Sequence, residues 1–534
     1  MAKLSKIGLN IVLLLLFQGA HAQIKYWVEF TDKGPQSNPD QAWVSEKTYQ
    51  QRATLGLPIR QASDIPVYTP YLHMLQQAGF EPVALSKWLN ATSMFLAPSE
   101  VEQVASFPFV QAVIPFRGEV FLTSTDRPAI SDSTQLHPAL LQMQAKAFLE
   151  RGITGQGVDV GIIDAGFVGA NNNPALKPLI ERNAVVAWKD LVNPEKASPY
   201  EEMETFLDWH GTKVWQGVGG YIPSRDQYMG IAVDANYYLV RSEHGTKEYR
   251  GEQDLWIAGM EWLDSLGVRI TNCSLGYSRG FDDPEENYSP DEMDGSTKIS
   301  QAVQTAVEEK GMILIISAGN DGNDISWRYI STPAEAKGVI SVGATNYPVW
   351  DKAGYSGVGP DYLPYLKPDV SVYAPDGTSF AAPVITGLVA GMLQLDSTLQ
   401  PARVQELLQA SGHLDVPNNY LGYGVPNCEY LYQALTGGEI PVKYVCHELA
   451  PTKPISTTFT PADYHWQAGE ALVAFHLGED GRTVIQERKI ILTEEDDEVK
   501  IVPPGAKVFL TNIVSSTGAC VNIPWKNQPE EKTE

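Results

Sequence analysis

The chain has 534 residues, of which 43 % are hydrophobic and 19 % charged, so it has a globular composition and length for about three domains. The formal net charge of −25 disfavours binding to nucleic acids and to anionic membranes, because both repel a strongly acidic protein. Four cysteines are too few for a disulfide-rich scaffold.

Residues 1–22 have the features of a signal peptide. Lys3 and Lys6 form a basic start, residues 11–17 form a short apolar run, and residues 20–22 (Ala-His-Ala) provide a cleavage site. The apolar run is too short to cross a bilayer comfortably, which disfavours a membrane anchor. We therefore expect an exported protein, periplasmic or extracellular, without a membrane span.

Residues 23–128 are expected to form a separate small α+β unit. Residues 26–30 are aromatic and β-branched, as is typical of a strand, and residues 109–115 indicate another. Ser99 and Glu100 precede a segment that predicts the start of a helix.

The central segment, residues 129–437, begins with a buried-strand pattern that ends in a carboxylate. Residues 158–163 are mostly apolar and lead into Asp164 and Gly166. Continuous apolar runs are typical of parallel strands, and open α/β sheets place their sites at the carboxyl ends of such strands. Asp164 is therefore a candidate catalytic residue, although a lone aspartate here could also cap a helix.

Two histidines, His210 and His244, are each followed by Gly-Thr-Lys. Gly211 leaves room beside the imidazole of His210, and an apolar stretch comes after it. His244 lies in a polar stretch instead. We favour His210 as the general base and expect His244 at the surface or at the rim of the site.

A serine and an asparagine complete the candidate chemistry. Ser379 follows Gly-Thr and opens an apolar, Ala-rich run, which predicts a nucleophile in the first turn of a buried helix. Unpaired N–H groups at a helix start favour developing negative charge. Residues 313–319 indicate another buried strand, and the amide of Asn320 could bind an oxyanion together with the Ser379 N–H.

The order Asp164, His210, Ser379 is that of the subtilisin triad. Four other stretches fit the same family: residues 230–235 (Gly-Ile-Ala-Val-Asp-Ala), 272–276 (Asn-Cys-Ser-Leu-Gly), 367–370 (Lys-Pro-Asp-Val) and 420–424 (Tyr-Leu-Gly-Tyr-Gly). From about residue 136 to residue 435 the chain therefore resembles the subtilisin-like serine endopeptidases, the subtilase family.

The resemblance implies a subtilisin-like parallel sheet sandwiched by helices, with polypeptide substrates. Ser379 would attack the scissile carbonyl, His210 would carry the proton, Asp164 would orient the imidazole, and Asn320 would bind the oxyanion. Substrate binding would involve two groups of small or apolar residues, one that pairs with substrate as a β-strand (Ser274, Leu275, Gly276) and one on the other side of the P1 pocket (Ser317, Ala318, Gly319). We expect an open, apolar pocket.

The sequence departs from the family pattern at three places. Lys213 stands where many members have a second histidine, and Ala165 replaces the usual Ser or Thr. The tract at residues 369–377, between Lys-Pro-Asp and Gly-Thr-Ser, is shorter than usual. None of these changes removes a proton-transfer group, but the short tract is expected to reshape one wall of the cleft.

The resemblance also implies that residues 23–128 are an inhibitory propeptide. Such a unit acts as a folding template and blocks the cleft until it is cut off, here in the polar stretch at residues 124–133. The alternative is a permanent N-terminal domain.

Residues 438–534 are predicted to form a small β domain. Residues 471–475, 489–492 and 507–510 indicate strands, and residues 478–481 a turn. Cys446 and Cys520 could form a disulfide, although Cys428 could pair with either. Cys273, inside a predicted central strand, is expected to be a buried thiol.

Catalysis of this kind needs no cofactor, and we assign no metal site. Subtilases often bind structural calcium, but the acidic clusters at residues 282–286 and 291–295 lack the alternating pattern of a calcium loop, so solvated loops are favoured. Two functions remain: a secreted serine endopeptidase made as a zymogen, and a non-catalytic binding or adhesion protein on the same scaffold. An esterase is disfavoured because Gly-Thr-Ser-Phe-Ala lacks the Gly-x-Ser-x-Gly elbow.

Overall fold

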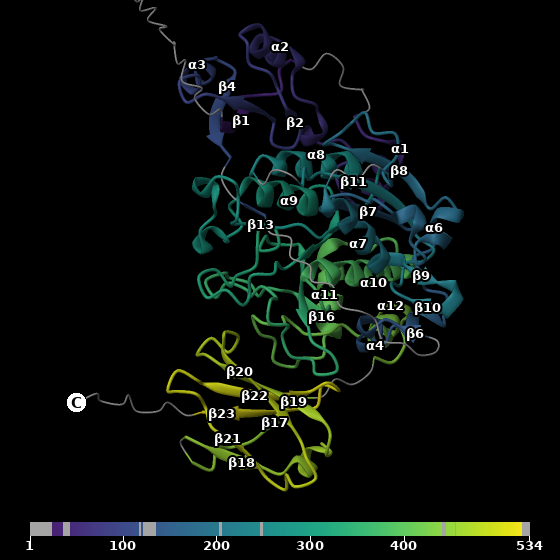
Figure 1. Ribbon diagram of the computed structural model, residues 1–534, viewed down its shortest axis with the longest axis vertical. Coiled ribbons are helices and arrows are strands. Elements are labelled where there is room, and N and C mark those ends of the chain that lie inside the picture. The colour runs from purple at the N-terminus through teal and green to yellow at the C-terminus, as the bar shows by residue number, and fades with distance from the viewer. Residues whose placement is uncertain are drawn as a thin grey trace, which may run out of the picture.

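A computed structural model describes residues 24–35, 43–116, 119–120, 135–201, 205–245, 249–440, 445–453 and 455–525. A large α/β unit lies at the centre of the molecule. An N-terminal α+β unit and a C-terminal β unit lie at its opposite ends (Figure 1). The predicted signal peptide falls outside the described residues.

The central unit is built on a seven-stranded sheet in the order β16-β15-β14-β12-β7-β11-β8, in which every neighbouring pair is parallel. The strands are β7 (Asp159–Asp164), β8 (Val185–Asp190), β11 (Asn236–Arg241), β12 (Ile270–Cys273), β14 (Ile313–Ser317), β15 (Ile340–Thr345) and β16 (Val370–Tyr373). Six of these strands are buried on both faces, which explains their nearly continuous apolar sequences, whereas the edge strand β8 is only partly buried.

Helices cover both faces of the sheet, as the sequence predicts. One face packs against α8 (Glu252–Ser265) and α9 (Lys298–Glu308), and the other against α7 (His210–Gly219) and α10 (Ala382–Leu395). Further helices are α4 (Pro138–Gln142), α5 (Lys146–Leu149), α6 (Lys177–Glu181), α11 (Pro401–Ser411) and α12 (Cys428–Thr436). The two apolar clusters on the two faces make this unit an α/β sandwich.

The segment Thr378–Leu395, which includes α10, is the one described stretch that is apolar and long enough to cross a membrane, but 83 % of it is buried inside the protein. Burial to this extent is typical of a helix in the core of a protein.

The N-terminal unit contains a four-stranded antiparallel sheet in the order β2-β3-β1-β4. Its elements are β1 (Ile24–Phe30), α1 (Glu46–Thr54), α2 (Thr69–Gln77), β2 (Ala84–Ser86), β3 (Ala91–Leu96), α3 (Val101–Ala105) and β4 (Val110–Pro115). One face of the sheet lies against α8, where Trp27 and Trp88 join the core of the central unit. The predicted strands and helix in this unit are present.

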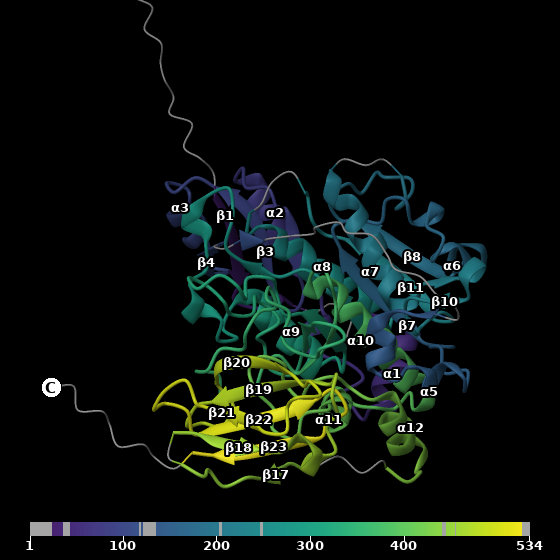
Figure 2. The ribbon, with the colours of Figure 1, turned by 60° about the horizontal axis from the view of Figure 1, so that its bottom comes forward.

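The C-terminal unit has a five-stranded sheet, β17-β23-β22-β19-β20, and a two-stranded sheet, β18-β21 (Figure 2). The strands are β17 (His447–Glu448), β18 (Thr457–Phe459), β19 (Ala471–Leu477), β20 (Val484–Ile491), β21 (Val499–Ile501), β22 (Leu510–Ser515) and β23 (Cys520–Pro524). Cys446 and Cys520 form a disulfide, and Cys428 is a buried free thiol.

One predicted strand is misplaced, because residues 507–509 precede β22 instead of belonging to it. Leu510 pairs with Leu477, the last residue of β19, so the strand pairing ends there, and the last bond in this direction is that of the Phe509 N–H with the Leu477 carbonyl oxygen at 2.9 Å. Contacts with the central unit include the ion pair of Lys489 with Asp351, at 2.5 Å.

Candidate active site

Asp164 and His210 meet at the carboxyl end of the central sheet. Asp164 is the last residue of β7 and is fully buried, and His210 is the first residue of α7. The Oδ1 atom of Asp164 lies 2.7 Å from Nδ1 of His210 and accepts a second hydrogen bond from the N–H of Ala165 at 2.8 Å. A carboxylate held in this way fixes the orientation of the imidazole and favours a proton on Nδ1, which leaves Nε2 as the basic nitrogen.

Gly211 makes this approach possible. A Cβ atom at Gly211 would lie 2.4 Å from the carbonyl oxygen of Gly166 and 2.9 Å from Cβ of Asp164. The residue after the histidine must therefore be glycine for α7 to lie this close to the end of β7.

Arg241 is a supporting residue that sequence reasoning missed. Its buried guanidinium donates to the carbonyl oxygen of Ala165 at 3.0 Å and pairs with Asp190 and Asp208, each at 3.2 Å. It thereby ties the loop after Asp164 to the turn before His210. The sequence contained one signal for this residue: it is charged and directly follows Leu-Val at the end of an apolar strand.

Ser379 lies in a short 3-10 turn (Thr378–Phe380) that leads directly into α10, so it precedes the helix in which it was expected. This turn packs against α7 and brings Ser379 to the side of the sheet where His210 lies. The Oγ atom of Ser379 donates to the carbonyl oxygen of Ser274 at 3.1 Å, and the Oγ atom of Ser274 donates to the carbonyl oxygen of Ser379 at 2.8 Å. A rotation about the Cα–Cβ bond of Ser379 would free its proton for the imidazole, and such loose geometry is common without substrate.

Asn320 is anchored beside the nucleophile by Thr378. Its Oδ1 accepts from the Thr378 N–H at 2.9 Å and from the Thr378 hydroxyl at 3.0 Å, which leaves the amide nitrogen free to face away from the turn. Gly319, with φ +90°, turns the chain at the end of β14 toward this position. An amide nitrogen is the type of donor that an oxyanion site uses, and the residue that Asn320 contacts directly precedes Ser379.

The predicted substrate segment, Ser274 to Gly276, directly follows β12 and leads into β13 (Tyr277–Ser278). A Cβ atom at Gly276 would lie 2.3 Å from Oγ of Ser331, so glycine is needed for this packing. Leu275 is fully buried. Ser317, the last residue of β14, and Ala318, which follows it, are also buried, and both are small.

His244 is placed apart from Asp164. Its Nδ1 lies 3.2 Å from a carboxylate oxygen of Glu252, and about a third of its side chain is exposed. Glu243, next to it, is buried and receives hydrogen bonds from Tyr277 and Ser242. Burial, together with the nearby Glu252 carboxylate, raises the pKa of Glu243 well above its usual value.

A cavity of 190 Å³ borders the site. Its lining includes Lys213, Asp376 and Phe380, and the ring of Phe380 lies 5.5 Å from the ring of His210. The ammonium group of Lys213 lies 4.2 Å from the centre of the Trp209 ring, a cation–π contact.

The cysteines provide no alternative nucleophile or metal site among the described residues. Burial raises the pKa of Cys273 to about 12, so its thiol is not a nucleophile at neutral pH. Within the part of the chain that the structure describes, one group could offer three metal ligands (Asp415, Cys446 and Cys520), but its two cysteines are disulfide-bonded. Calcium binding stays a prediction.

Comparisons with known proteins identify the family of the chain. Residues 155–424, just over half of the chain, match the subtilase family (peptidase S8), and residues 25–129 match the peptidase S8 propeptide domain of Bacteroidota. Subtilisin NAT from Bacillus subtilis subsp. natto is 26 % identical over 352 residues, 64 % of this chain and 81 % of that protein. Subtilisin DY from Bacillus licheniformis is 28 % identical over 288 residues, 52 % of this chain and 92 % of that protein.

A crystal structure of the epidermin leader peptide processing serine protease from Staphylococcus aureus has a similar fold. The TM-score is 0.51 with 15 % sequence identity, and the match covers 79 % of this chain and all of that one.

Proposed function

Since the chain belongs to the subtilase family and is a serine endopeptidase made with a propeptide, we propose that it cuts peptide bonds with Asp164, His210 and Ser379. The observation that carries this proposal is the 2.7 Å contact between buried Asp164 and His210, beside the turn that holds Ser379.

The proposed reaction begins when Ser379 Oγ attacks the scissile carbonyl carbon and His210 Nε2 accepts the hydroxyl proton. The imidazolium, stabilised by Asp164, then donates this proton to the leaving amine, and a water molecule releases the acyl group by the same route. The Asn320 amide and the Ser379 N–H hold the oxyanion in both tetrahedral intermediates. No cofactor takes part.

The proposal includes pairing of the substrate with Ser274 to Gly276 as an added β-strand. The N-terminal unit supports this geometry, because β5 (Glu119–Val120) pairs antiparallel with β13, immediately after Gly276. The end of the N-terminal unit thus approaches the cleft along the path proposed for a substrate. We propose processing within residues 124–133, and export through residues 1–22. Structural calcium stays part of the proposal as an optional ligand.

The decisive experiment compares wild type with Ser379→Ala. A fluorophosphonate probe should label wild type at Ser379, and wild type should lose residues up to about 124–133 by intact mass and digest casein. The variant should do none of these. A folded wild-type protein that resists the probe, even after an added protease has removed the N-terminal unit, would instead support the binding or adhesion protein.

A further inference from the structure

We propose that the C-terminal unit takes part in substrate binding, and that a 620 Å³ cavity at its contact with the central unit holds the part of a polypeptide substrate that follows the scissile bond. This part is called the leaving-side segment below, because it departs with the new amino terminus. The inference rests on the proposed endopeptidase function and adds a second binding site to it, away from the catalytic residues.

The chemistry of peptide cleavage determines where the leaving-side segment begins. His210 must donate its proton to the leaving amine, so the residues after the scissile bond start beside the imidazole. The 190 Å³ cavity lies on this side, since its lining includes Phe380, whose ring is 5.5 Å from that of His210. The residues before the scissile bond are assigned instead to the strand at Ser274 to Gly276.

The described parts of the protein's own chain follow the same direction. Residues 119–120 (β5) pair with β13, directly after Gly276. The next described residues form β6 (Gln135–Leu136), which pairs with β10 (Gln227–Tyr228), and His137 then lines the 190 Å³ cavity. The chain therefore lies beside Gly276 before the proposed processing segment and beside this cavity after it, in the order expected of a substrate.

Helix α4 lies at the end of the central unit next to the C-terminal unit and forms a wall of both cavities (Figure 1). His137, which directly precedes α4, lines the 190 Å³ cavity, and Leu141 and Gln142, at the end of α4, line the 620 Å³ cavity. A helical rise of about 1.5 Å per residue places the two ends of this wall about 7.5 Å apart. An extended polypeptide advances about 3.3 Å per residue, so two or three residues span this distance.

An aromatic surface runs along α4. The N–H of Tyr373, the last residue of β16, donates to Oε1 of Gln142 at 2.7 Å. The ring of Tyr373 lies 5.9 Å from that of His137 and 5.8 Å from that of Tyr347. Tyr347 is 44 % exposed and Leu141 is 49 % exposed, so apolar surface beside α4 is open to a bound chain.

The 620 Å³ cavity combines residues of two units. Residues 516–518, in the turn between β22 and β23, line it from the C-terminal unit, and Trp350, His413 and Tyr430 line it from the central unit. The rings of Trp350 and His413 are T-shaped, with centres 5.0 Å apart. The volume is within the range of roughly 300–1,000 Å³ that is usual for ligand sites. Other lining residues have amide or hydroxyl side chains (Gln144, Asn427, Ser516, Thr517).

The composition of this lining favours an uncharged stretch of polypeptide. Its carboxylate, Glu429, pairs with Arg151 at 3.2 Å, and the described residues of the lining include no lysine or arginine that would select an anion. Aromatic rings bind apolar side chains, and amide and hydroxyl groups bind the donors and acceptors of an extended backbone.

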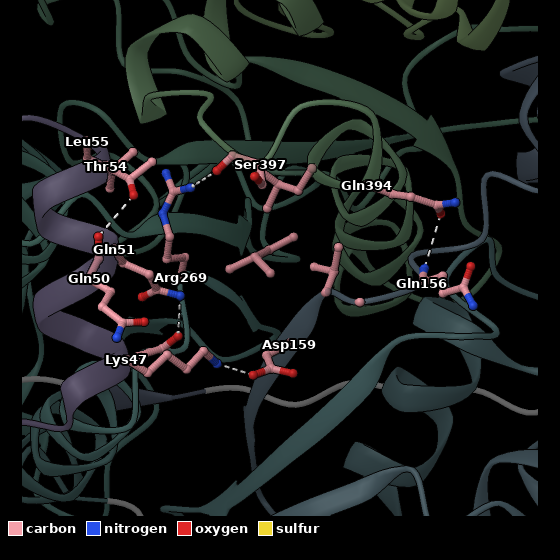
Figure 3. A pocket seen from close by; sticks show the side chains of 15 residues that line it. Lys47, Gln50, Gln51, Thr54, Leu55, Gln156, Asp159, Arg269, Gln394 and Ser397 are labelled. Carbon is pink, nitrogen blue, oxygen red and sulfur yellow. Dashed lines mark hydrogen bonds and ion pairs between the residues drawn. The ribbon is translucent and has the colours of Figure 1, made fainter.

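Another large cavity lies off this path. The 410 Å³ cavity in Figure 3 is lined by Lys47 and Gln51 of α1 and by Asp159, the first residue of β7. Asp164 ends the same strand, about 17 Å away. This cavity is therefore at the end of the sheet opposite the candidate active site, whereas the 620 Å³ cavity shares α4 with the cavity beside His210.

The length of the leaving-side segment follows from this path. With about two residues in each cavity and two or three along α4, it needs about six or seven residues. Binding of a remote part of the substrate helps to position the scissile bond against the nucleophile, so its effect is expected in kcat/KM.

The first test compares two peptides that share the residues before the scissile bond and have two or eight uncharged residues after it. The longer peptide should have a kcat/KM at least tenfold higher. Trp350→Ala and Thr517→Trp, which fills the cavity from an exposed turn, should each remove most of this gain and change kcat/KM for the shorter peptide less than twofold. Ile491→Ala is the control in the C-terminal unit, because Ile491 is 64 % exposed and does not line the cavity. Equal kcat/KM for the two peptides, or the same gain in every variant, would overturn the inference.

The second test needs no cleavage and so separates this inference from the proposed function. The eight-residue leaving-side segment alone, with a fluorescent label at its carboxyl end, is titrated with the full chain carrying Ser379→Ala. Its Kd in fluorescence anisotropy should be at least tenfold lower than with the same chain carrying Thr517→Trp as well. Such a difference supports the inference even if neither peptide is cut, a result that would contradict the proposed function alone. Equal Kd values would overturn the inference, and so would Thr517-dependent binding of chitotriose in place of the peptide, because the cavity would then be a carbohydrate site.

Discussion

Replacement of Gly211 by alanine should lower kcat/KM by about 100-fold, about 2.7 kcal/mol in transition-state stabilisation. The new Cβ would lie 2.4 Å from the Gly166 carbonyl oxygen and 2.8 Å from the Phe167 ring. An ordinary carbon–oxygen contact is about 3.3 Å or longer, so the start of α7 must move by about 1 Å. His210 directly precedes this position, and its 2.7 Å contact with Asp164 would be lost or lengthened.

The assay is kcat/KM on a fluorogenic peptide together with the rate of fluorophosphonate labelling of Ser379. Gly505→Ala is the control, because a Cβ atom there would meet no heavy atom within 4 Å. Thermal unfolding of both variants separates misplacement of His210 from loss of the fold. A folded Gly211→Ala enzyme that keeps more than a third of wild-type kcat/KM would refute the steric reasoning.

Three further predictions concern the oxyanion site, pH and the disulfide. Asn320→Ala should lower kcat by about 10²–10³-fold with little change in KM, which is the usual cost of losing one oxyanion donor. A rise in KM of the same size as the expected fall in kcat would argue against this role. Burial raises the pKa of Glu335 from 4.5 to about 7, so the folded state keeps a proton that the unfolded state loses, and stability falls as pH rises from about 4.5 to about 7. Glu335→Gln should remove up to about 3 kcal/mol of this fall, measured as the difference in unfolding free energy between pH 5 and pH 8. An equal fall in wild type and variant would contradict the prediction. Cys520→Ser should destabilise the C-terminal unit by about 4 kcal/mol, since Cys446 and Cys520 close a loop with a sequence separation of 74, and an unchanged unfolding transition in calorimetry would count against this.

The candidate site residues were predictable because each lies in a short segment whose local chemistry is distinctive. Asp164 ends an apolar strand, Gly211 follows a histidine, and Ser379 lies in the turn that precedes an Ala-rich helix. The connection of these segments by a parallel sheet was also predictable from the apolar runs. Residues 507–509 were assigned to a strand wrongly, because strand ends depend on where the partner strand ends.

The supporting network around the site was not predictable in the same way. Arg241 binds Asp208 and Asp190, which are 33 and 51 residues away along the chain. Arg52 of α1 and Asp264 of α8, which form an ion pair between the two units, are separated by 212 residues. A sequence pattern carries information about neighbours within a few residues, and it contains no signal for pairs at such distances.

The sequence by itself determined the class of fold, the family and the candidate catalytic residues, since strand burial, glycine at close approaches and motif chemistry are local properties. Only the tertiary structure decided which charges are buried together and that the N-terminal unit packs against α8 of the central unit. These features depend on burial, which arises when segments distant along the chain pack together and exclude water.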